Sequence, residues 1–246
     1  MYKFEFISID NSTAGNVLAN NHLNRYFINS GFRRNDELME YISRTKEGSM
    51  VFATEDVGRY NLLLVGGVHG NELASQAALI KLMNNIINEE IKLKCQLNII
   101  PFLIPYSSMT NTRHFNDKDM NRNAHVDGIT KKIVDYAQEN KITALCDCHS
   151  TDPNCNPGFA SVYCSVRPLI DSSKIARHIC LETNSRILPI ADAGSVLKGA
   201  VEDEANIRGI PAVTCEAVSK NGTLTESSVN FSYKQICAFL NYFGVI

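Results

Sequence analysis

The chain has 246 residues, of which 44% are hydrophobic, and this is enough for one large α/β domain with a full core. A net charge of -2 and an isoelectric point near 6.3 give no general attraction to nucleic acid or acidic membranes, so neither is an expected partner. No apolar run approaches the roughly 18 to 20 residues needed to cross a bilayer. The N-terminus lacks the features of a secretory signal, so we expect a soluble, cytoplasmic protein.

The first half of the chain alternates between strand and helix patterns. An apolar run of strand length closes in glycines at residues 61–68, and apolar residues then recur at steps of three and four over 73–89, which predicts a helix. A further apolar run over 97–104 predicts a strand that Pro101 moves to an edge or a bulge. Earlier in the chain, the patterns predict strands over 2–9 and 50–54 and mostly helix over 20–46 with a break at Gly31.

The second half continues this alternation after a long loop over 105–127, and loops of that length are usually functional or disordered. Strands are expected over 142–149, 158–164 and 210–217, and helices over 129–140, 172–184, 197–208 and 230–243. The alternation predicts an α/β fold in which helices cover both faces of a mainly parallel, mixed sheet. One catalytic domain is expected over residues 1–246.

A histidine and a carboxylate stand three residues apart where the strand over 61–68 gives way to a helix. His69 and Glu72 would lie at the carboxyl end of that strand, where open α/β sheets place their ligands. Catalytic zinc normally takes three protein ligands and a water, so the pair needs a third ligand and a base.

His149 is the candidate third ligand. Side chains alternate along a strand, so Asp147 and His149 share one face of residues 142–149, while Cys146 and Cys148 share the other. A rival zinc site built from these cysteines, His149 and Cys155 is disfavoured, because both strand cysteines point away from His149. The eight cysteines are expected to be small buried hydrophobic residues rather than disulfides.

Glu216 is the candidate base. It ends the otherwise apolar strand over 210–217, and a carboxylate at such a place costs free energy unless it is paired or used. In a zinc site it can take the proton of the attacking water.

The long loop supplies candidates for holding an anionic substrate. The forked guanidinium of an arginine grips a carboxylate through parallel hydrogen bonds, so Arg113, Asn121 and Arg122 are expected to form a socket. Asp119 is placed to orient a metal-binding imidazole.

These motifs together resemble the zinc metallocarboxypeptidase superfamily, including its succinylglutamate desuccinylase and aspartoacylase branch. His69-Gly-Asn-Glu72 matches the HxxE zinc pair, and Asp119-Met-Asn121-Arg122 matches the DxNR element. Asp147-Cys-His149-Ser150 and the strand that ends in Glu216 follow in the family's order.

The resemblance implies a three-layer α/β/α domain with one zinc ion held by His69, Glu72 and His149. It also implies Glu216 as base and then acid, and Arg113 as the group that polarises the scissile carbonyl. Asn121 and Arg122 would bind the substrate carboxylate. Two features depart from the pattern. Ala193-Gly194-Ser195 occupies the region of the carboxypeptidase tyrosine. Only 30 residues follow Glu216, mostly one predicted helix, so we do not expect the further β domain of aspartoacylases among them.

The expected function is therefore zinc-dependent hydrolysis of an amide or peptide bond next to a free carboxylate, as in a metallocarboxypeptidase or peptide amidase. The alternative within this class is an N-acyl amino acid deacylase. An alternative of another class is a zinc-containing module that binds carboxylates without turning them over. The expected partner is a small acidic peptide or N-acyl amino acid, and the oligomeric state stays open.

Overall fold

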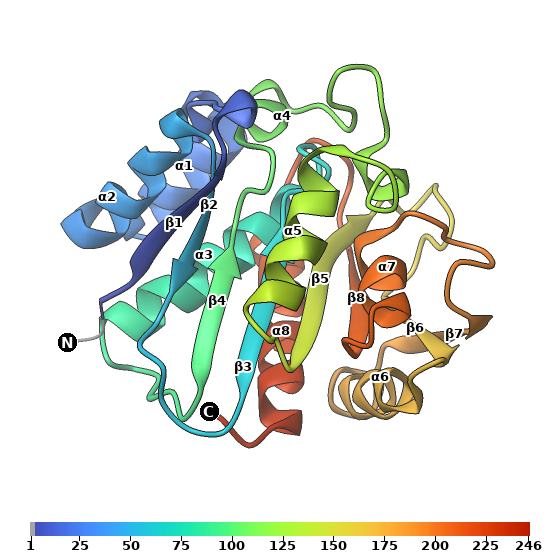
Figure 1. Cartoon of the computed structure of the whole chain (residues 1–246). Helices are drawn as coiled ribbons and strands as arrows, with labels where there is room; N and C mark the ends of the chain where they lie inside the picture. The colour runs from blue at the N-terminus through green and yellow to red at the C-terminus, as the bar shows by residue number, and fades with distance from the viewer. Residues whose placement is uncertain (1–2) are drawn as a thin grey trace.

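One eight-stranded sheet forms the centre of the computed structural model, which describes residues 3–246 (Figure 1). Its strands are β1 (Glu5–Asp10), β2 (Ser49–Ala53), β3 (Asn61–Gly66), β4 (Gln96–Ile100), β5 (Ala144–Thr151), β6 (Ser161–Arg167), β7 (Arg186–Asp192) and β8 (Ala212–Val218). The α-helices are α1 (Asn21–Asn29), α2 (Asp36–Ser43), α3 (Leu73–Ile87), α4 (Pro105–Thr110), α5 (Gly128–Glu139), α6 (Ile170–Thr183), α7 (Val201–Ile207) and α8 (Glu226–Tyr242). The expectation of a single α/β sheet domain is confirmed.

The strands lie in the order β1-β2-β4-β3-β5-β8-β6-β7. The four central strands β4, β3, β5 and β8 run parallel to one another, whereas β2 pairs with β4, and β6 with β8, in the antiparallel direction. The sheet is therefore mixed with a parallel centre, as predicted. The carboxyl ends of β3, β5 and β8 meet at one edge, which is where parallel sheets hold ligands.

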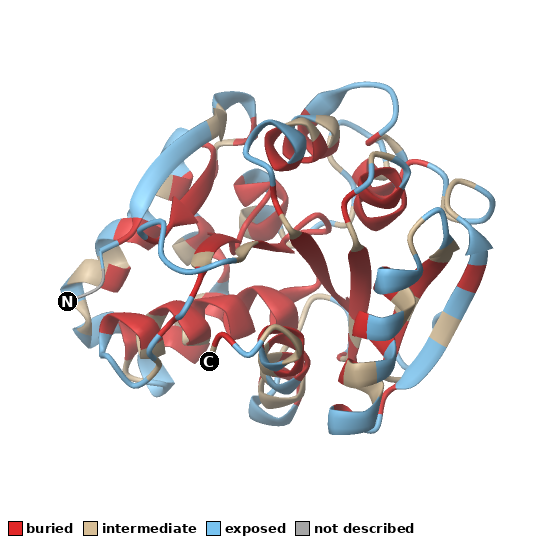
Figure 2. Cartoon of the chain, turned by 60° about the horizontal axis from the view of Figure 1, so that its bottom comes forward, coloured by how far each residue is buried: buried red, intermediate tan, exposed pale blue. Residues whose placement is uncertain are grey.

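Two apolar cores lie on the two faces of this sheet, and Figure 2 shows the buried central strands between them. The larger core packs α1, α2, α3, α6 and α8 against side chains such as Leu64 and Val213. The smaller core packs α5 and α7 against the alternate side chains, including Leu63 and Leu145. Because neighbouring residues of a strand point to opposite faces, each central strand serves both cores and is apolar along most of its length.

Two local predictions are wrong, and one strand is not predicted. The strand over 97–104 is not at an edge: β4 lies between β2 and β3 and ends at Ile100, so Pro101 follows the ladder and removes no hydrogen bond from it. The loop over 105–127 contains α4, which starts at Pro105, a residue whose fixed φ suits a first helical turn. The strand that is not predicted is β7, an exposed edge strand that contains Pro189. The strand expected over 2–9 corresponds to β1, and its first residue lies outside the described range.

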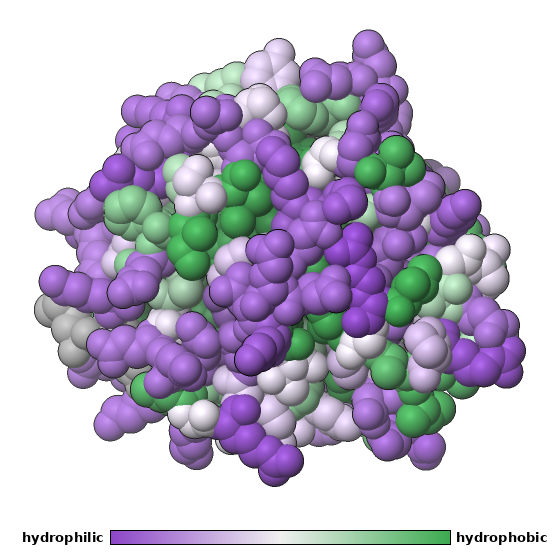
Figure 3. Space-filling model, viewed as in Figure 1, coloured by the Kyte–Doolittle hydropathy of each residue, from purple (hydrophilic) through white to green (hydrophobic). Residues whose placement is uncertain are grey.

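All eight cysteines are free, and five of them are buried. This confirms that they act mainly as small core residues. The surface seen in Figure 3 is largely hydrophilic, with separate apolar patches. Among residues 3–246, no helix combines the length and the apolar character that a membrane span requires.

Candidate active site

His69 and Glu72 lie in the short connection between β3 and α3. The connection is tight: a Cβ atom on Gly70 would lie 2.0 Å from the carbonyl carbon of Ser107, so two backbones touch there. The side chain of Gln76 donates hydrogen bonds to the carbonyl oxygens of His69 and Gly70. These contacts aim both side chains inward, and His69 Nδ1 lies 2.7 Å from Glu72 Oε1.

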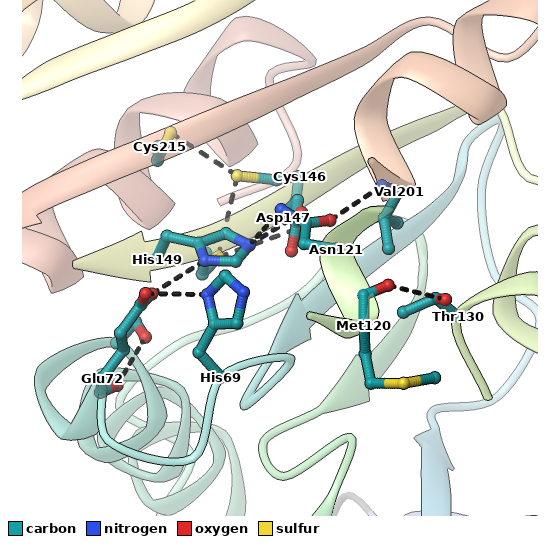
Figure 4. A network of polar contacts seen from close by, with 12 residues as sticks. His69, Glu72, Met120, Asn121, Thr130, Cys146, Asp147, His149, Val201 and Cys215 are labelled. Atoms are coloured by element: carbon teal, nitrogen blue, oxygen red, sulfur yellow. Dashed lines mark hydrogen bonds and ion pairs between the residues drawn. The ribbon is translucent and has the colours of Figure 1, made fainter. Parts of the chain in front are cut away.

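His149 reaches the same point from the end of β5. Its Nδ1 lies 2.7 Å from Glu72 Oε2, and the backbone N–H of Ser150 donates to the same oxygen. Figure 4 shows both imidazoles turned toward Glu72. All three side chains are almost completely buried, with 2% to 4% of their surface exposed. Burial disfavours the charge of Glu72, but the charges of His69 and His149 outweigh this and hold the pKa of Glu72 well below its usual range.

The donor set suits a zinc ion. His69, Glu72 and His149 each offer one ligand atom, and these atoms lie within 4.8 Å of one another; no other such group of histidine, cysteine or acidic residues occurs in residues 3–246. Two nitrogens and one oxygen are the ligands of many catalytic zinc sites. Each imidazole also has its Nε2 atom 2.9 Å from a carboxylate, which is Asp119 for His69 and Asp147 for His149. Such carboxylates orient metal-binding histidines.

The rival cysteine site does not form. Cys146 and Cys148 belong to the larger core, on the face of the sheet opposite His149, and the Cys146 sulfur lies 3.6 Å from that of Cys215. Hydrogen bonds with the thiols of Cys148 and Cys215, together with burial, raise the pKa of Cys146 well above its usual range. The Cys146 thiol therefore stays protonated in an apolar setting, which does not suit a metal.

Glu216 stands beside His149 in the β5–β8 ladder. Its Oε2 atom is buried and has no hydrogen-bond partner in the described part of the chain. Burial, followed by repulsion from Glu72, raises the pKa of Glu216 to about 8. A carboxylate in this state can accept and return a proton near neutral pH.

Arg113 is already paired. Its Nη1 donates to Glu72 Oε1 at 3.0 Å, and its Nη2 donates to Asp119 Oδ2 at 3.2 Å. The guanidinium therefore bridges a candidate zinc ligand and the carboxylate that orients another one. Its side chain remains 41% exposed, so the far edge of the group can still reach a ligand in the pocket.

Asn121 and Arg122 play different parts in the structure. The Asn121 side chain lies between β5 and α7: its Nδ2 is 3.3 Å from His149 Nε2, and its Oδ1 accepts a hydrogen bond from the Val201 N–H. Arg122 Nη1 donates to the carbonyl oxygen of Asn121. Arg122 is thus anchored through one nitrogen, and its remaining N–H groups make no hydrogen bond to residues 3–246.

A pocket of about 130 Å³ joins these groups. The predicted residues on its wall are His69, Glu72, Arg113, Asn121, Arg122, His149 and Glu216. Sequence reasoning missed two functional candidates. Asp147 could have been found, because it shares a strand face with His149. Tyr163 could not, because it reaches the pocket through the antiparallel pairing of β6 with β8.

Comparison with protein families gives a match over residues 59–162 to the Succinylglutamate desuccinylase/Aspartoacylase catalytic domain. This confirms the resemblance drawn from the motifs. Glu216 lies beyond the matched range. A search of curated proteins gives no match.

Solved structures share the fold at low sequence identity. A succinylglutamate desuccinylase from Silicibacter has 18% identity and a TM-score of 0.63, covering 80% of this chain and 61% of that one. A tripeptide-bound cell shape determinant protein from Helicobacter pylori has 15% identity and a TM-score of 0.64, covering 81% and 56%. A metallo-carboxypeptidase from Burkholderia cenocepacia has 11% identity and a TM-score of 0.63, covering 79% and 60%. The chain thus spans less than two thirds of each of these structures.

Proposed function

We propose, on the premise that residues 59–162 belong to the succinylglutamate desuccinylase/aspartoacylase catalytic-domain family, that the protein is a zinc-dependent hydrolase. Its reaction is the cleavage of an amide or peptide bond next to a free carboxylate. The observation that carries the proposal is the meeting of His69, Glu72 and His149 within 4.8 Å, with Glu216 beside His149 in the sheet.

His69, Glu72 and His149 would hold the zinc ion. A bound zinc ion lowers the pKa of water to near neutrality and polarises a carbonyl group. Asp119 and Asp147 fix the orientation of the two imidazoles through the Nε2 contacts described above. In this proposal the carboxylate of Glu72, which contacts the Nδ1 atoms of His69 and His149, would serve as a zinc ligand together with them.

Glu216 moves the proton in the proposed reaction. Its carboxylate faces the pocket, and its Oε2 has no partner among the described residues that would compete for the proton. It takes a proton from the attacking water and returns it to the leaving amine. One side chain therefore acts first as base and then as acid.

Arg113 and Arg122 divide the task of holding the substrate. Arg113, at the Glu72 side of the pocket, would donate to the scissile carbonyl oxygen as negative charge develops there. Arg122, anchored by Asn121, would pair with the substrate carboxylate. A direct contact between the Asn121 amide and substrate stays a prediction, since that amide lies between His149 and Val201.

Two substrate classes follow from two different observations. The family match favours N-acyl amino acids, whereas the similarity of fold to a tripeptide-bound structure and to a metallo-carboxypeptidase favours short peptides. Both classes place an amide bond close to a free carboxylate, so the site chemistry is the same for either.

Metal removal combined with a substrate panel tests the function. Protein freed of metal by a chelator should hydrolyse none of the panel, and one equivalent of zinc should restore turnover of at least one member. The panel contains N-acetyl and N-succinyl amino acids, dipeptides and γ-linked peptides, with product detection by mass spectrometry. Saturable binding of a panel member to zinc-loaded protein without any product would instead favour a non-catalytic carboxylate-binding module.

The cytoplasm is the proposed location. Eight free thiols, of which Cys155 is exposed, suit a reducing compartment. Fractionation of the native cells with an antibody to the protein would test this, and recovery from the extracellular medium would contradict it.

A further inference from the structure

Tyr163 lies on the wall of the pocket and faces the same side of the sheet as Glu216. Strand β6 runs antiparallel to β8, with Ser161 opposite Glu216 and Tyr163 opposite Thr214. Alternate residues of a strand share a face, so Tyr163, Thr214 and Glu216 all point toward the pocket. All three contribute to its lining.

The Tyr163 hydroxyl is not used by the fold. It makes no hydrogen bond to residues 3–246, although the side chain is half-buried. Burial and the charge of Glu216 raise the pKa of Tyr163, and the charge of Arg122 opposes this rise. The phenol is therefore protonated at neutral pH, and a protonated hydroxyl can donate one hydrogen bond to a ligand.

The other donors expected to hold a substrate carboxylate are largely committed. Arg113 bridges Glu72 and Asp119. The Asn121 amide lies between β5 and the start of α7. Arg122 retains free N–H groups and contributes to the same pocket wall as Tyr163. A cationic fork and a neutral hydroxyl at one place suit the two oxygens of a carboxylate.

We propose that the Tyr163 hydroxyl and the Arg122 guanidinium together bind the free carboxylate of the substrate. This inference rests on the proposed function, and it assigns the preference for a free acid over an amide to a named pair.

A binding experiment with a matched ligand pair tests the proposal. The parent protein is zinc-loaded Glu216→Gln, which keeps ligands intact during calorimetry. The ligands are the panel member that wild-type protein hydrolyses best, or N-acetylglycylglycine if none is hydrolysed, and the carboxamide of the same compound. Tyr163→Phe in this parent should weaken binding of the acid about tenfold, because one hydrogen bond to a charged group is lost, and should leave binding of the carboxamide unchanged.

Two further variants complete the experiment. Arg122→Gln should show the same selective loss for the acid, and Tyr106→Phe, an exposed tyrosine on α4, should change neither affinity. Unchanged acid binding in Tyr163→Phe, or an equal loss for acid and carboxamide, would overturn the assignment. An acid that does not bind the parent would overturn it as well. The proposed function fails separately, if zinc-loaded wild-type protein turns over no member of the panel.

Discussion

Glu216 is a half-buried residue whose carboxylate oxygen Oε2 is buried and has no hydrogen-bond partner in the described part of the chain. Its neighbours explain its high pKa: burial and the charge of Glu72 favour the protonated form, whereas His149 and Arg113 favour the ionised one. A group under opposing influences of this kind is suited to gaining and losing a proton within one reaction cycle.

Replacing this carboxylate by its amide should separate metal binding from catalysis. Glu216→Gln should bind one zinc ion with unchanged affinity, because Glu216 is not among the three converging ligands, and should lower kcat by roughly 10³-fold or more. Zinc is measured by competition with a chromogenic chelator, and kcat with the best panel substrate. Glu139→Gln, at an exposed position on α5, is the matched control and should retain full activity. Near-normal turnover by Glu216→Gln would refute the role of the residue.

Helix α7 carries a buried carboxylate, that of Glu202, which is not among the residues that line the candidate active-site pocket. Glu202 is fully buried, and its Oε1 accepts hydrogen bonds from the Ser165 N–H and from Asn206 Nδ2. Its Oε2 has no partner in the described part of the chain. Burial, followed by the charge of Asp203, raises the pKa of Glu202 to about 8, so this side chain is protonated in the folded protein at neutral pH.

This residue should make the stability of the protein depend on pH. The unfolded chain loses the Glu202 proton near pH 4.5, whereas the folded chain keeps it to about pH 8, so the free energy of unfolding falls as the pH rises between these values. Urea unfolding should show that Glu202→Gln removes roughly 2 kcal/mol of the loss seen between pH 6 and pH 8. Exposed Glu139→Gln again serves as the control. Parallel pH profiles for Glu202→Gln and wild-type protein would contradict the argument.

The connection between β3 and α3 depends on close contact between two backbones. Gly70 has no room for a side chain because the Ser107 carbonyl group occupies the space that a Cβ atom would need. Gly31, between α1 and α2, has open space around it, but its φ of +77° is unfavourable for other residues. Glycine is thus required at position 70 by close packing and at position 31 by the backbone conformation.

Substituting each glycine in turn should show which requirement positions the candidate zinc ligands His69 and Glu72. Gly70→Ala should destabilise the protein by at least about 2 kcal/mol in urea unfolding and should weaken zinc binding, since the connection that carries His69 and Glu72 has to move. Gly31→Ala should cost roughly 1 kcal/mol and leave zinc affinity unchanged. Equal zinc affinities in the two variants would show that the contact with Ser107 does not position the ligands.

At the scale of the whole molecule, local sequence patterns predict the α/β layers and the strands that end near His69, His149 and Glu216. Alternation along residues 142–149 separates His149 from Cys146 and Cys148, and the structure places them on opposite faces. The short spacing of His69 and Glu72 keeps them together whatever the sheet order is. The prediction that Glu216 lies near His149 depends on the resemblance in motif order, because no local pattern contains it, and the β5–β8 ladder pairs the two residues.

Two of the features that sequence reasoning missed depend on contacts between residues far apart in the chain. Tyr163 reaches the pocket only because β6 reverses direction beside β8. Arg113 donates a hydrogen bond to Glu72, but it lies in a loop, and the hydrophobic periodicity of a sequence does not predict the course of a loop. An edge strand such as β7, exposed and containing Pro189, has little of the apolar alternation that marks a strand.

The alternating face of β5 has a consequence for insertions and deletions. Asp147 and His149 share the strand with Cys146 and Cys148, so side chains of the candidate site and of the larger core alternate one by one. Losing Leu145 while the ladder is kept would turn the Cys146 and Cys148 thiols toward the face of the pocket and the His149 imidazole into the larger apolar core. Evolution can therefore exchange individual side chains along this strand but cannot change its length between Ala144 and His149 without losing the site and the core together.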